Sequence, residues 1–530
     1  MSRIIVRNSC IVIDDYDLED CPELERNFMV YDPVTHSSDR FGMYYDSGDR
    51  KLYLPRGIDL WKIKQYLKTT VAHKEPPNTY MRTDKILLKT KPRDDNQREA
   101  LRFMIGVEEY AGNIDEPQLS VNLNTGKGKT YCSIATIGYF KVKAIIITAS
   151  LTLLTQWKNN IMEYTNLTDN DIMKIDGPQS LNMIYNDKSS KAKRACIFLC
   201  SHTTLRRYGE DYSWKKLNTV FEKLGIGIKI FDEAHTNFDN MLMVDFFTNV
   251  EKTYYVTATP ARSNWSENKI YQLSVKNIPA IDLFDAVNDP HTEYIAIKYN
   301  SRPTAQQISM CRNSYGLDRN KYIDYLTKQP NFYAIMRIIM EMVLKVDKPV
   351  LMYIGTNESI LRVYRWICFN YPEYIGDVGI YTSLIPSNLK FAERRKRIIL
   401  STTKSMGAGE DVKGLKITFV VAEPFRSNVL AAQTLGRTRD DDTLYIELVD
   451  LGFKQTRNFY YSKQAVFNKY AKSVSETTID QYELDNRAYN IEYKRNKGPY
   501  VSPIVLHDER FFEYKDEEPT CGEAIIFYNK

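Results

Sequence analysis

The chain has 530 residues, which is too long for a single ordinary hydrophobic core, so we expect roughly two to four domains. Hydrophobic residues make up 43% of it and charged residues 26%, which excludes an intrinsically disordered chain. The formal net charge of +5 permits a nucleic-acid partner but does not require one.

The eight cysteines show neither a CxxC pair nor the Cys/His spacing of a zinc site, a pattern typical of free thiols in a reducing compartment. The N-terminal sequence MSRIIVRNSC lacks the apolar core of a signal peptide. No apolar run approaches the roughly 20 residues that span a membrane. We therefore expect a cytoplasmic protein with no membrane partner. Frequent Asn, Lys, Ile and Tyr indicate an AT-rich genome, and for a viral source the location would be the host-cell cytoplasm.

Residues 1–88 are expected to form a small α+β domain. Short alternating apolar runs, IIVRNSCIVI and KLYLPRG, predict strands, and the spacing of apolar residues predicts a helix over 59–67. This segment contains no catalytic motif. A basic, proline-containing break at 89–93 follows it.

Residues 89–275 alternate between predicted strands and helices. Near-continuous apolar runs are what a parallel sheet covered on both faces requires, and a second series of them predicts another domain at 346–455. Residues 276–345 are expected to link the two domains, and 456–530 to form a C-terminal extension with many basic residues and tyrosines. The predicted fold class is therefore α/β, with two parallel sheets in tandem. The predicted strands are 119–123, 144–148, 195–200, 226–231 and 253–258 in the first domain, and 349–354, 378–381, 398–402, 417–422 and 443–449 in the second.

The segment LNTGKGKT at 123–130 follows a strand and begins a helix, which is the setting of a phosphate-binding loop. Gly126 and Gly128 allow backbone N–H groups to turn toward phosphate oxygens. Lys129 supplies a positive charge for the β and γ phosphates, and the Thr130 hydroxyl can ligate magnesium. The strict pattern has a glycine at the first position, where this loop has leucine. The alternative is a glycine-containing turn that binds nothing.

About a hundred residues later, KIFDEAH places Asp232 and Glu233 at the end of an apolar strand. Two adjacent carboxylates leaving a buried strand are costly unless a cation or a reaction uses them. In phosphoryl transfer the first can hold magnesium through water, and the second can orient the attacking water. The alternative, an exposed acidic turn, is weakened by the preceding loop. A Thr-Ala-Thr-Pro sequence at 257–260 ends the next strand and can link the nucleotide site to moving elements.

Further segments occur in the order found in superfamily 2 helicases. One resembles the segment whose glutamine binds adenine, two resemble strand-contact motifs, and two resemble motifs V and VI. The sequence resembles in particular the XPB-like branch, with its phage UvsW-type and poxviral transcript-release helicases, over roughly residues 94–450. The segments are DNQREA (95–100), TASLTLLTQW (148–157), SHTTL (201–205), STTKSMGAGEDV (401–412) and QTLGR (433–437).

This resemblance implies two RecA-like domains that hold ATP and Mg²⁺ between them. It implies that Thr130 and Asp232 hold the metal, partly through water. The family pattern QxxGRxxR would place a second arginine at 440, where this chain has Asp440, so the arginine finger is either Arg437 or Arg439. The implied catalytic residues are Lys129, Asp232, Glu233, Gln433, Arg437 and Arg439. The implied ATP-binding residues are Gln97, Thr125, Gly126, Lys127, Gly128, Lys129, Thr130, Gly409 and Asp411.

The resemblance implies an ATP-dependent helicase or translocase that unwinds or remodels duplex or branched DNA. One alternative is an RNA helicase or transcript-release factor, which shares these motifs. Another is a non-catalytic binding module that uses the nucleotide as a clamp. Such a module would be recognised by the loss of Lys129, Glu233 or Arg437, and all three are present. Residues 1–88 would either recognise the substrate or only buttress the first domain. The C-terminal extension is interpreted as structural rather than as a contact with a nucleic-acid strand. The sequence does not identify any protein partner.

Overall fold

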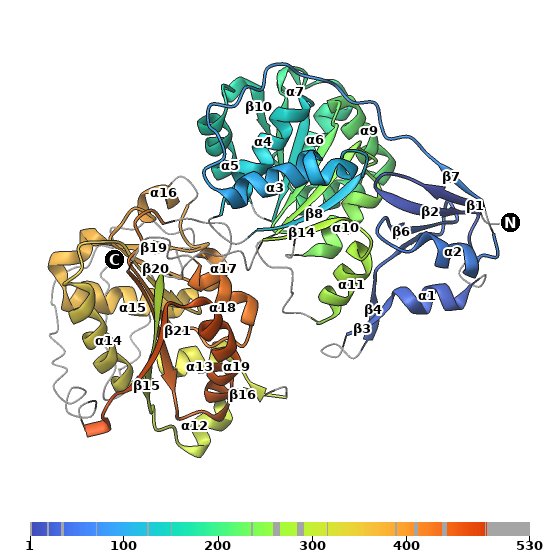
Figure 1. The fold of residues 1–530 in the computed structure, drawn as a ribbon. Helices are drawn as coiled ribbons and strands as arrows, with labels where there is room; N and C mark the ends of the chain where they lie inside the picture. Colours follow the sequence, from blue (N-terminus) through green and yellow to red (C-terminus); the bar gives the residue numbers. More distant parts are fainter. Residues whose placement is uncertain are drawn as a thin grey trace. The chain divides into compact units, whose positions relative to one another are not determined.

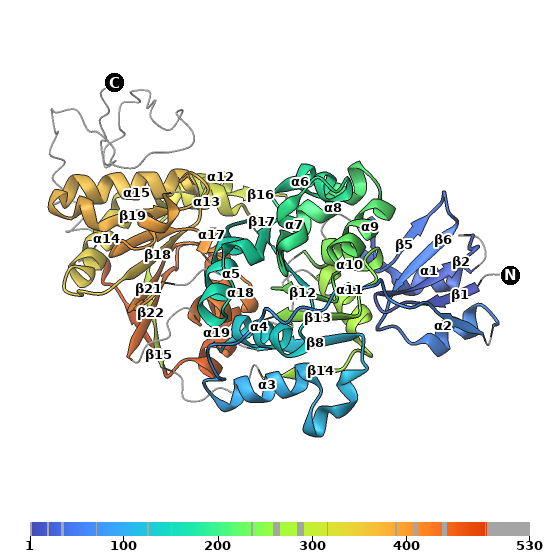
Figure 2. The same cartoon turned by 90° about the horizontal axis from the view of Figure 1, so that it is seen from above.

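The computed structural model describes residues 3–17, 21–32, 37–69, 71–123, 127–149, 151–234, 237–257, 265–283, 291–314, 316–386, 389–406, 412–436, 442–482 and 484. The chain divides into two compact units, Met1–Val287 and Asn288–Lys530 (Figures 1 and 2). Within the described ranges, no helix combines the length and apolarity needed to cross a lipid bilayer. The seven cysteines in these ranges are all buried and free, as predicted.

The first unit is built on a seven-stranded sheet in which every neighbouring pair runs parallel. In spatial order its strands are β10 (Ile172–Lys174), β11 (Ile197–Ser201), β9 (Ala144–Thr148), β12 (Ile228–Asp232), β13 (Lys252–Thr257), β8 (Gln118–Asn122) and β14 (Ala280–Asp282). The five strands predicted here are confirmed as β8, β9, β11, β12 and β13. Each of them is buried along its whole length, which explains its near-continuous apolar sequence.

Helices cover both faces of this sheet (Figure 1). The core on one face is completed by α3 (Asp95–Ile105), α4 (Lys129–Phe140) and α5 (Leu151–Tyr164). The core on the other face is completed by six further helices of the described residues. These are α6 (Gly177–Tyr185), α7 (Ser190–Arg194), α8 (His202–Asp211), α9 (Trp214–Leu224), α10 (Phe238–Phe246) and α11 (Trp265–Val275).

The N-terminal residues form a second, five-stranded sheet, so the small α+β domain predicted from the sequence is present. Its order is β5 (Tyr44–Asp46), β6 (Lys51–Pro55), β2 (Cys10–Asp14), β1 (Arg3–Val6) and β7 (Ala72–Lys74). Its pairs are antiparallel except for β1 with β7. One face packs with α1 (Pro22–Phe28) and α2 (Leu60–Tyr66), and α2 confirms the helix predicted at 59–67. A separate antiparallel pair, β3 (Met29–Asp32) and β4 (Ser37–Phe41), follows α1.

The other face of the N-terminal sheet lies in the same hydrophobic core as α8 to α11. Cys10, Val12 and Tyr53 belong to this core together with Phe246 and Phe247. The ring centroids of Tyr53 and Phe247 are 4.7 Å apart. Because the N-terminal sheet and the first parallel sheet share one core, the two cannot separate without exposing apolar surface.

Hydrogen bonds link the turn between β1 and β2 to the first residue of β8 and to the loop before β13. Gln118, which begins β8, donates from Nε2 to the Ser9 carbonyl at 2.9 Å and to Asp245 Oδ2 at 2.7 Å. The Asn249 side-chain oxygen accepts from the backbone N–H groups of Asn8 and Ser9 at 3.0 and 3.3 Å. These contacts support the buttressing role predicted for residues 1–88. Substrate recognition by the same residues stays a prediction.

The second unit contains another seven-stranded sheet in which every neighbouring pair is parallel. In spatial order its strands are β19 (Val378–Tyr381), β20 (Ile398–Ser401), β18 (Val350–Ile354), β21 (Ile417–Ala422), β22 (Thr443–Asp450), β15 (Thr292–Tyr299) and β23 (Ser473–Thr478). The five strands predicted in the second domain are confirmed. The core on one face includes α13 (Arg319–Leu326), α14 (Pro330–Val343) and α15 (Asn357–Asn370), and the core on the other includes α18 (Asn428–Leu435) and α19 (Lys454–Tyr470).

The structure differs from the sequence-based division at both ends of the second domain. Strand β15 lies within the predicted linking segment 276–345, yet it pairs with β22 and β23 inside the sheet. Its sequence TEYIAIKY alternates between buried and half-buried residues, unlike the continuous apolar runs used to predict strands. Strand β23, SVSETT, is polar because it is an exposed edge strand. Helix α19 and β23 therefore belong to the second unit, although most of α19 and all of β23 fall in the predicted extension 456–530. The other boundaries stay predictions.

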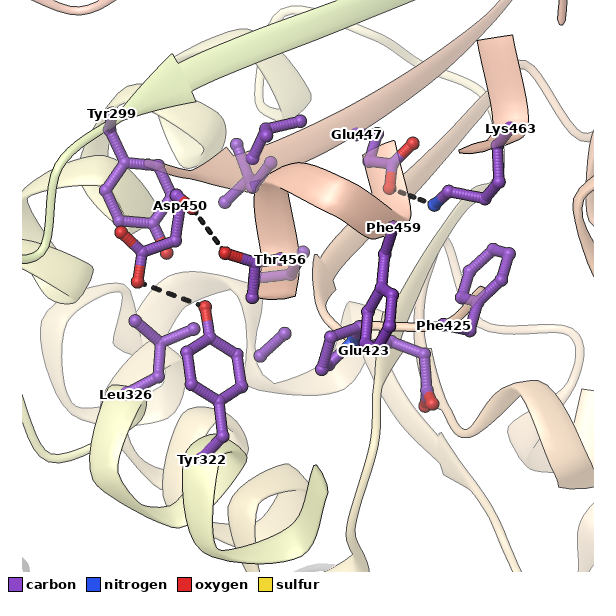
Figure 3. Close-up of a pocket in the computed structure, with 15 residues that line it drawn as sticks. Tyr299, Tyr322, Leu326, Glu423, Phe425, Glu447, Asp450, Thr456, Phe459 and Lys463 are labelled. Carbon is purple, nitrogen blue, oxygen red and sulfur yellow. Dashed lines mark hydrogen bonds and ion pairs between the residues drawn. The ribbon is translucent and has the colours of Figure 1, made fainter. Parts of the chain in front are cut away.

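A polar pocket lies near the ends of β21 and β22 in the second unit (Figure 3). Glu447 forms an ion pair with Lys463 and accepts a hydrogen bond from the Tyr294 hydroxyl at 2.8 Å. Asp450 accepts a hydrogen bond from the Tyr322 hydroxyl at 3.2 Å. These groups bind one another, so we interpret them as a buried network that holds α13 and α19 to the sheet.

Candidate active site

Three sequence motifs of the first unit meet at one edge of its sheet. Strands β12, β13 and β8 are neighbours, and their carboxyl ends lie at the same edge because they are parallel. The Leu123 N–H donates to the Thr257 carbonyl at 3.0 Å, and the Ala234 N–H donates to the Val256 carbonyl at 3.0 Å. The phosphate-loop segment, the two carboxylates and the Thr-Ala-Thr-Pro segment therefore leave the sheet side by side.

The phosphate-loop segment leads directly into α4. Gly128 caps this helix with φ 95°, a left-handed conformation that side-chain-bearing residues rarely adopt. The backbone N–H groups of the first turn of a helix have no partners within the helix, and together with the helix dipole they favour an anion. Lys127 and Thr130 are half-buried at this helix start. The local geometry is therefore suited to binding phosphate groups.

Gln97 lies against this loop. The Asp94 side chain caps α3 by accepting from the Gln97 N–H at 2.9 Å. This cap fixes the start of the helix and therefore the position of the Gln97 backbone. Gln97 is buried, and its side-chain oxygen accepts from the Arg93 N–H at 2.8 Å. A Cβ built on Gly128 would lie 2.1 Å from Gln97 Nε2, so the amide touches the loop backbone.

Replacing Gly128 with alanine is expected to weaken nucleotide binding by about tenfold, because strained backbone of this kind costs about 1–3 kcal/mol. The added Cβ would both meet the Gln97 amide and oppose the left-handed φ. Calorimetric titration with ADP measures the effect. Gly112→Ala is the matched control, because a Cβ there meets nothing within 4 Å. Equal affinities for both variants would contradict this account of the loop.

Two predicted catalytic side chains contact each other directly. Lys129 Nζ lies 2.9 Å from Glu233 Oε1, and the two side chains are only 10% and 8% exposed. Glu233 has φ 52°, a left-handed conformation for a residue that is not glycine. Strain of this kind clusters at functional sites. The strand end thus holds a buried carboxylate and a buried ammonium together beside the phosphate loop.

Asp232 is held from two sides. The indole Nε1–H of Trp157 donates to its Oδ2 at 2.7 Å, and the Glu233 N–H donates to its Oδ1 at 3.0 Å. Burial and the neighbouring Glu233 carboxylate raise the pKa of Asp232 to about 6, although Lys129 and the Trp157 hydrogen bond act in the opposite direction.

The donor set at this edge fits magnesium. Thr130 offers a hydroxyl and Asp232 a carboxylate, both oxygen ligands, and Mg²⁺ usually keeps several waters and is otherwise held by one or two carboxylates and substrate phosphates. Within the described part of the chain, no group of three His, Cys, Asp or Glu side chains could hold a metal by itself. The residues therefore fit a metal that arrives with a phosphorylated substrate.

Several predicted site residues lie outside the described residues. In the second unit α18 carries Gln433, whose side chain is also outside them. The residues outside are Thr125, Gly126, His235, Thr259, Pro260, Gly409, Asp411, Arg437 and Arg439. The roles of all of these stay predictions.

Trp157 is a site residue that the sequence reasoning missed. It ends the segment 148–157, which was assigned by resemblance to strand contact, but its indole contacts the predicted magnesium carboxylate. The strand that precedes its helix could have indicated this contact, since β9 is the direct neighbour of β12 in the sheet. A donor on the helix after β9 is therefore well placed to reach the end of β12.

Known proteins resemble this chain in both sequence and fold. Residues 90–262 match the family described as type III restriction enzyme, res subunit. The chain is 24% identical over 334 residues to transcript termination protein A18 of Yaba monkey tumor virus, which covers 60% of this chain and 64% of that protein. It is 26% identical over 148 residues to the putative DNA 3'-5' helicase Rad25 of Haloarcula marismortui, which covers 28% of this chain and 21% of that protein. The chain resembles the superfamily 2 helicases.

The helicase resemblance extends to the fold. Dbp5 of S. cerevisiae, solved bound to RNA and ADP BeF3, matches 76% of this chain and 94% of its own, with a TM-score of 0.50 and 15% identity. This match confirms the two tandem RecA-like domains predicted from the sequence. The chain spans less than two thirds of the length of both curated relatives, 64% and 21%.

Proposed function

We propose that the chain is an ATP-dependent nucleic-acid helicase or translocase that unwinds or remodels duplex or branched DNA. The observation that carries this proposal is the cluster of Lys129, Asp232 and Glu233 beside the phosphate loop. A cation, a metal-binding carboxylate and a second carboxylate at one sheet edge are the groups that nucleotide hydrolysis requires. The sequence similarity to superfamily 2 helicases supports the same conclusion.

We assign each step of nucleotide binding and hydrolysis to residues of this chain. Gln97 would bind the adenine edge, and the loop with residues 125–128 would hold the phosphates on backbone N–H groups. Lys129 would exchange its ion pair with Glu233 for the β and γ phosphates. The freed carboxylate would then orient the attacking water.

Thr130 and Asp232 would hold Mg²⁺, in part through water. The metal would neutralise charge on the β and γ phosphate oxygens. In the second RecA-like domain, Gly409 and Asp411 would bind the nucleotide, and Gln433 would help to sense it. Arg437 or Arg439 would stabilise the charge that develops on the γ-phosphate, as arginine fingers do.

A second candidate is an RNA helicase or transcript-release factor. The similarity to a protein named for transcript termination favours it. A non-hydrolysing clamp is less well supported, because the phosphate-binding lysine and the water-orienting carboxylate are both present and in contact.

Steady-state ATP hydrolysis tests the proposal. Rates would be measured at one salt concentration with single-stranded DNA, duplex DNA, branched DNA or RNA, and then repeated at higher salt. We expect duplex or branched DNA to stimulate most, and the stimulation to fall with salt because the contacts go mainly to phosphates. Stimulation by RNA alone would favour the RNA-helicase candidate. No hydrolysis with any of them would overturn the motor proposal.

A further inference from the structure

The contact between Trp157 and Asp232 is built to fix one side chain. Trp157 is 3% exposed and lies on the middle of α5, which follows β9. Its indole has a single N–H donor, and this donor reaches Asp232 Oδ2 at 2.7 Å. The Glu233 N–H occupies the other carboxylate oxygen at 3.0 Å. With one donor on each oxygen, the carboxylate plane is held in a single orientation.

This orientation leaves carboxylate lone pairs available to a metal. A carboxylate has roughly four lone-pair sites, and the two hydrogen bonds use two of them. The remaining lone pairs can accept from metal-bound water or ligate the metal directly. A side chain whose ligand direction is already set loses less conformational freedom when the metal binds.

A purely structural explanation would hold that any buried indole must find a hydrogen-bond partner. Trp366 argues against this as a general rule in the chain. It is fully buried, and within the described residues its Nε1 has no hydrogen-bond partner. The partner of Trp157 is, by contrast, a carboxylate of the candidate active site.

We infer that Trp157 is a positioning residue, which orients the Asp232 carboxylate for the magnesium ion that accompanies the nucleotide. This inference rests on the proposed function. It assigns to Trp157 a role in metal-dependent nucleotide binding, separate from any contact of its segment with a nucleic-acid strand. The hydrogen bond, rather than the bulk of the indole, carries the effect.

The test is nucleotide binding by the full chain carrying Trp157→Phe, which keeps an aromatic ring and removes the donor. Calorimetry would give the dissociation constant of ADP with Mg²⁺ and, separately, with EDTA. We expect the constant with Mg²⁺ to rise about 10- to 100-fold, the usual effect of losing an outer hydrogen bond to a metal ligand. The constant with EDTA should change by less than about twofold, since Trp157 contacts the carboxylate and not the nucleotide.

Trp366→Phe is the matched control, because it removes a buried indole whose N–H has no partner in the described residues. It should leave both constants unchanged. An equal loss of affinity with Mg²⁺ and with EDTA in Trp157→Phe would overturn the inference in favour of a general packing defect. Unchanged affinity under both conditions would overturn it too.

A second measurement needs no variant. The chain has five tryptophans, so ¹⁵N-labelled indoles give five N–H signals. Adding Mn²⁺·ADP should broaden one signal strongly, and Mg²⁺·ADP should shift that same signal, whereas ADP with EDTA should not. No metal-dependent shift of any indole signal would contradict the inference.

The outcomes separate this inference from the proposed function. If the unaltered chain binds no ADP with or without metal, both are overturned. If it binds Mg²⁺·ADP and hydrolyses ATP, and Trp157→Phe does so equally well, only the positioning role of Trp157 fails.

Discussion

Replacing Glu233 with glutamine is expected to lower the kcat of ATP hydrolysis by about 100- to 10,000-fold, the usual contribution of a positioned proton-accepting group. Glutamine keeps the length of the side chain but removes the charge that would orient and activate water. It also removes the carboxylate that pairs with Lys129 at 2.9 Å. The lysine is then available to phosphate, so we expect ADP binding to be retained or tightened. Steady-state hydrolysis and calorimetry with ADP measure the two effects.

The control for this variant is Glu222→Gln, a glutamate-to-glutamine change at an exposed position on α9. It should leave kcat and ADP affinity unchanged. If Glu233→Gln retained full hydrolysis, the carboxylate that orients water would have to be another residue. If it lost ADP binding together with hydrolysis, the loss would reflect damage to the phosphate site rather than to the chemical step.

Replacing Asp245 with alanine is expected to destabilise the first unit by about 3–5 kcal/mol, because a charged lysine would be left buried without its partner. Asp245 and Lys229 are 1% and 0% exposed, and their charged atoms are 2.5 Å apart. The carboxylate also accepts hydrogen bonds from Gln118 at 2.7 Å and from the Tyr255 hydroxyl at 2.6 Å. Hydrogen exchange of peptides that contain β12 measures the opening free energy of this region directly.

The double variant Lys229→Met with Asp245→Leu separates charge from packing. Replacing a buried ion pair with apolar residues of similar volume is often close to neutral. We therefore expect the double variant to be clearly more stable than Asp245→Ala alone. If both variants lose equal stability, the hydrogen bonds to Gln118 and Tyr255 carry the effect, and the ion pair contributes little.

The parallel sheets were predictable from the sequence because their central strands are buried on both faces. A strand such as β9, AIIIT, has no polar position, so its apolar run is visible without any knowledge of its neighbours. Strands β15 and β23 were not predictable in this way. The first alternates because one face is only half-buried, and the second is polar because it lies at an edge.

The candidate site was predictable where chemistry limits the choice of residue. A phosphate loop needs glycine, lysine and a hydroxyl in sequence, and the adjacent carboxylates at 232 and 233 are recognisable for the same reason. That Gln97 belongs to the nucleotide site was implied only by resemblance, and the structure places its side chain against Gly128. Trp157 was missed because its partner lies 75 residues away in the chain, and only the sheet order brings them together.

The core shared by the N-terminal sheet and the first parallel sheet has a consequence for synthesis of the chain. Asn8 bonds to Asn249, 241 residues later, and the apolar face around Cys10, Val12 and Tyr53 is covered by residues of the same late region. At about 5–20 residues per second, a ribosome needs about 12–50 s to add the missing partners. During that interval the N-terminal sheet carries uncovered apolar surface, which is the kind of surface that chaperones bind and that aggregates at high concentration.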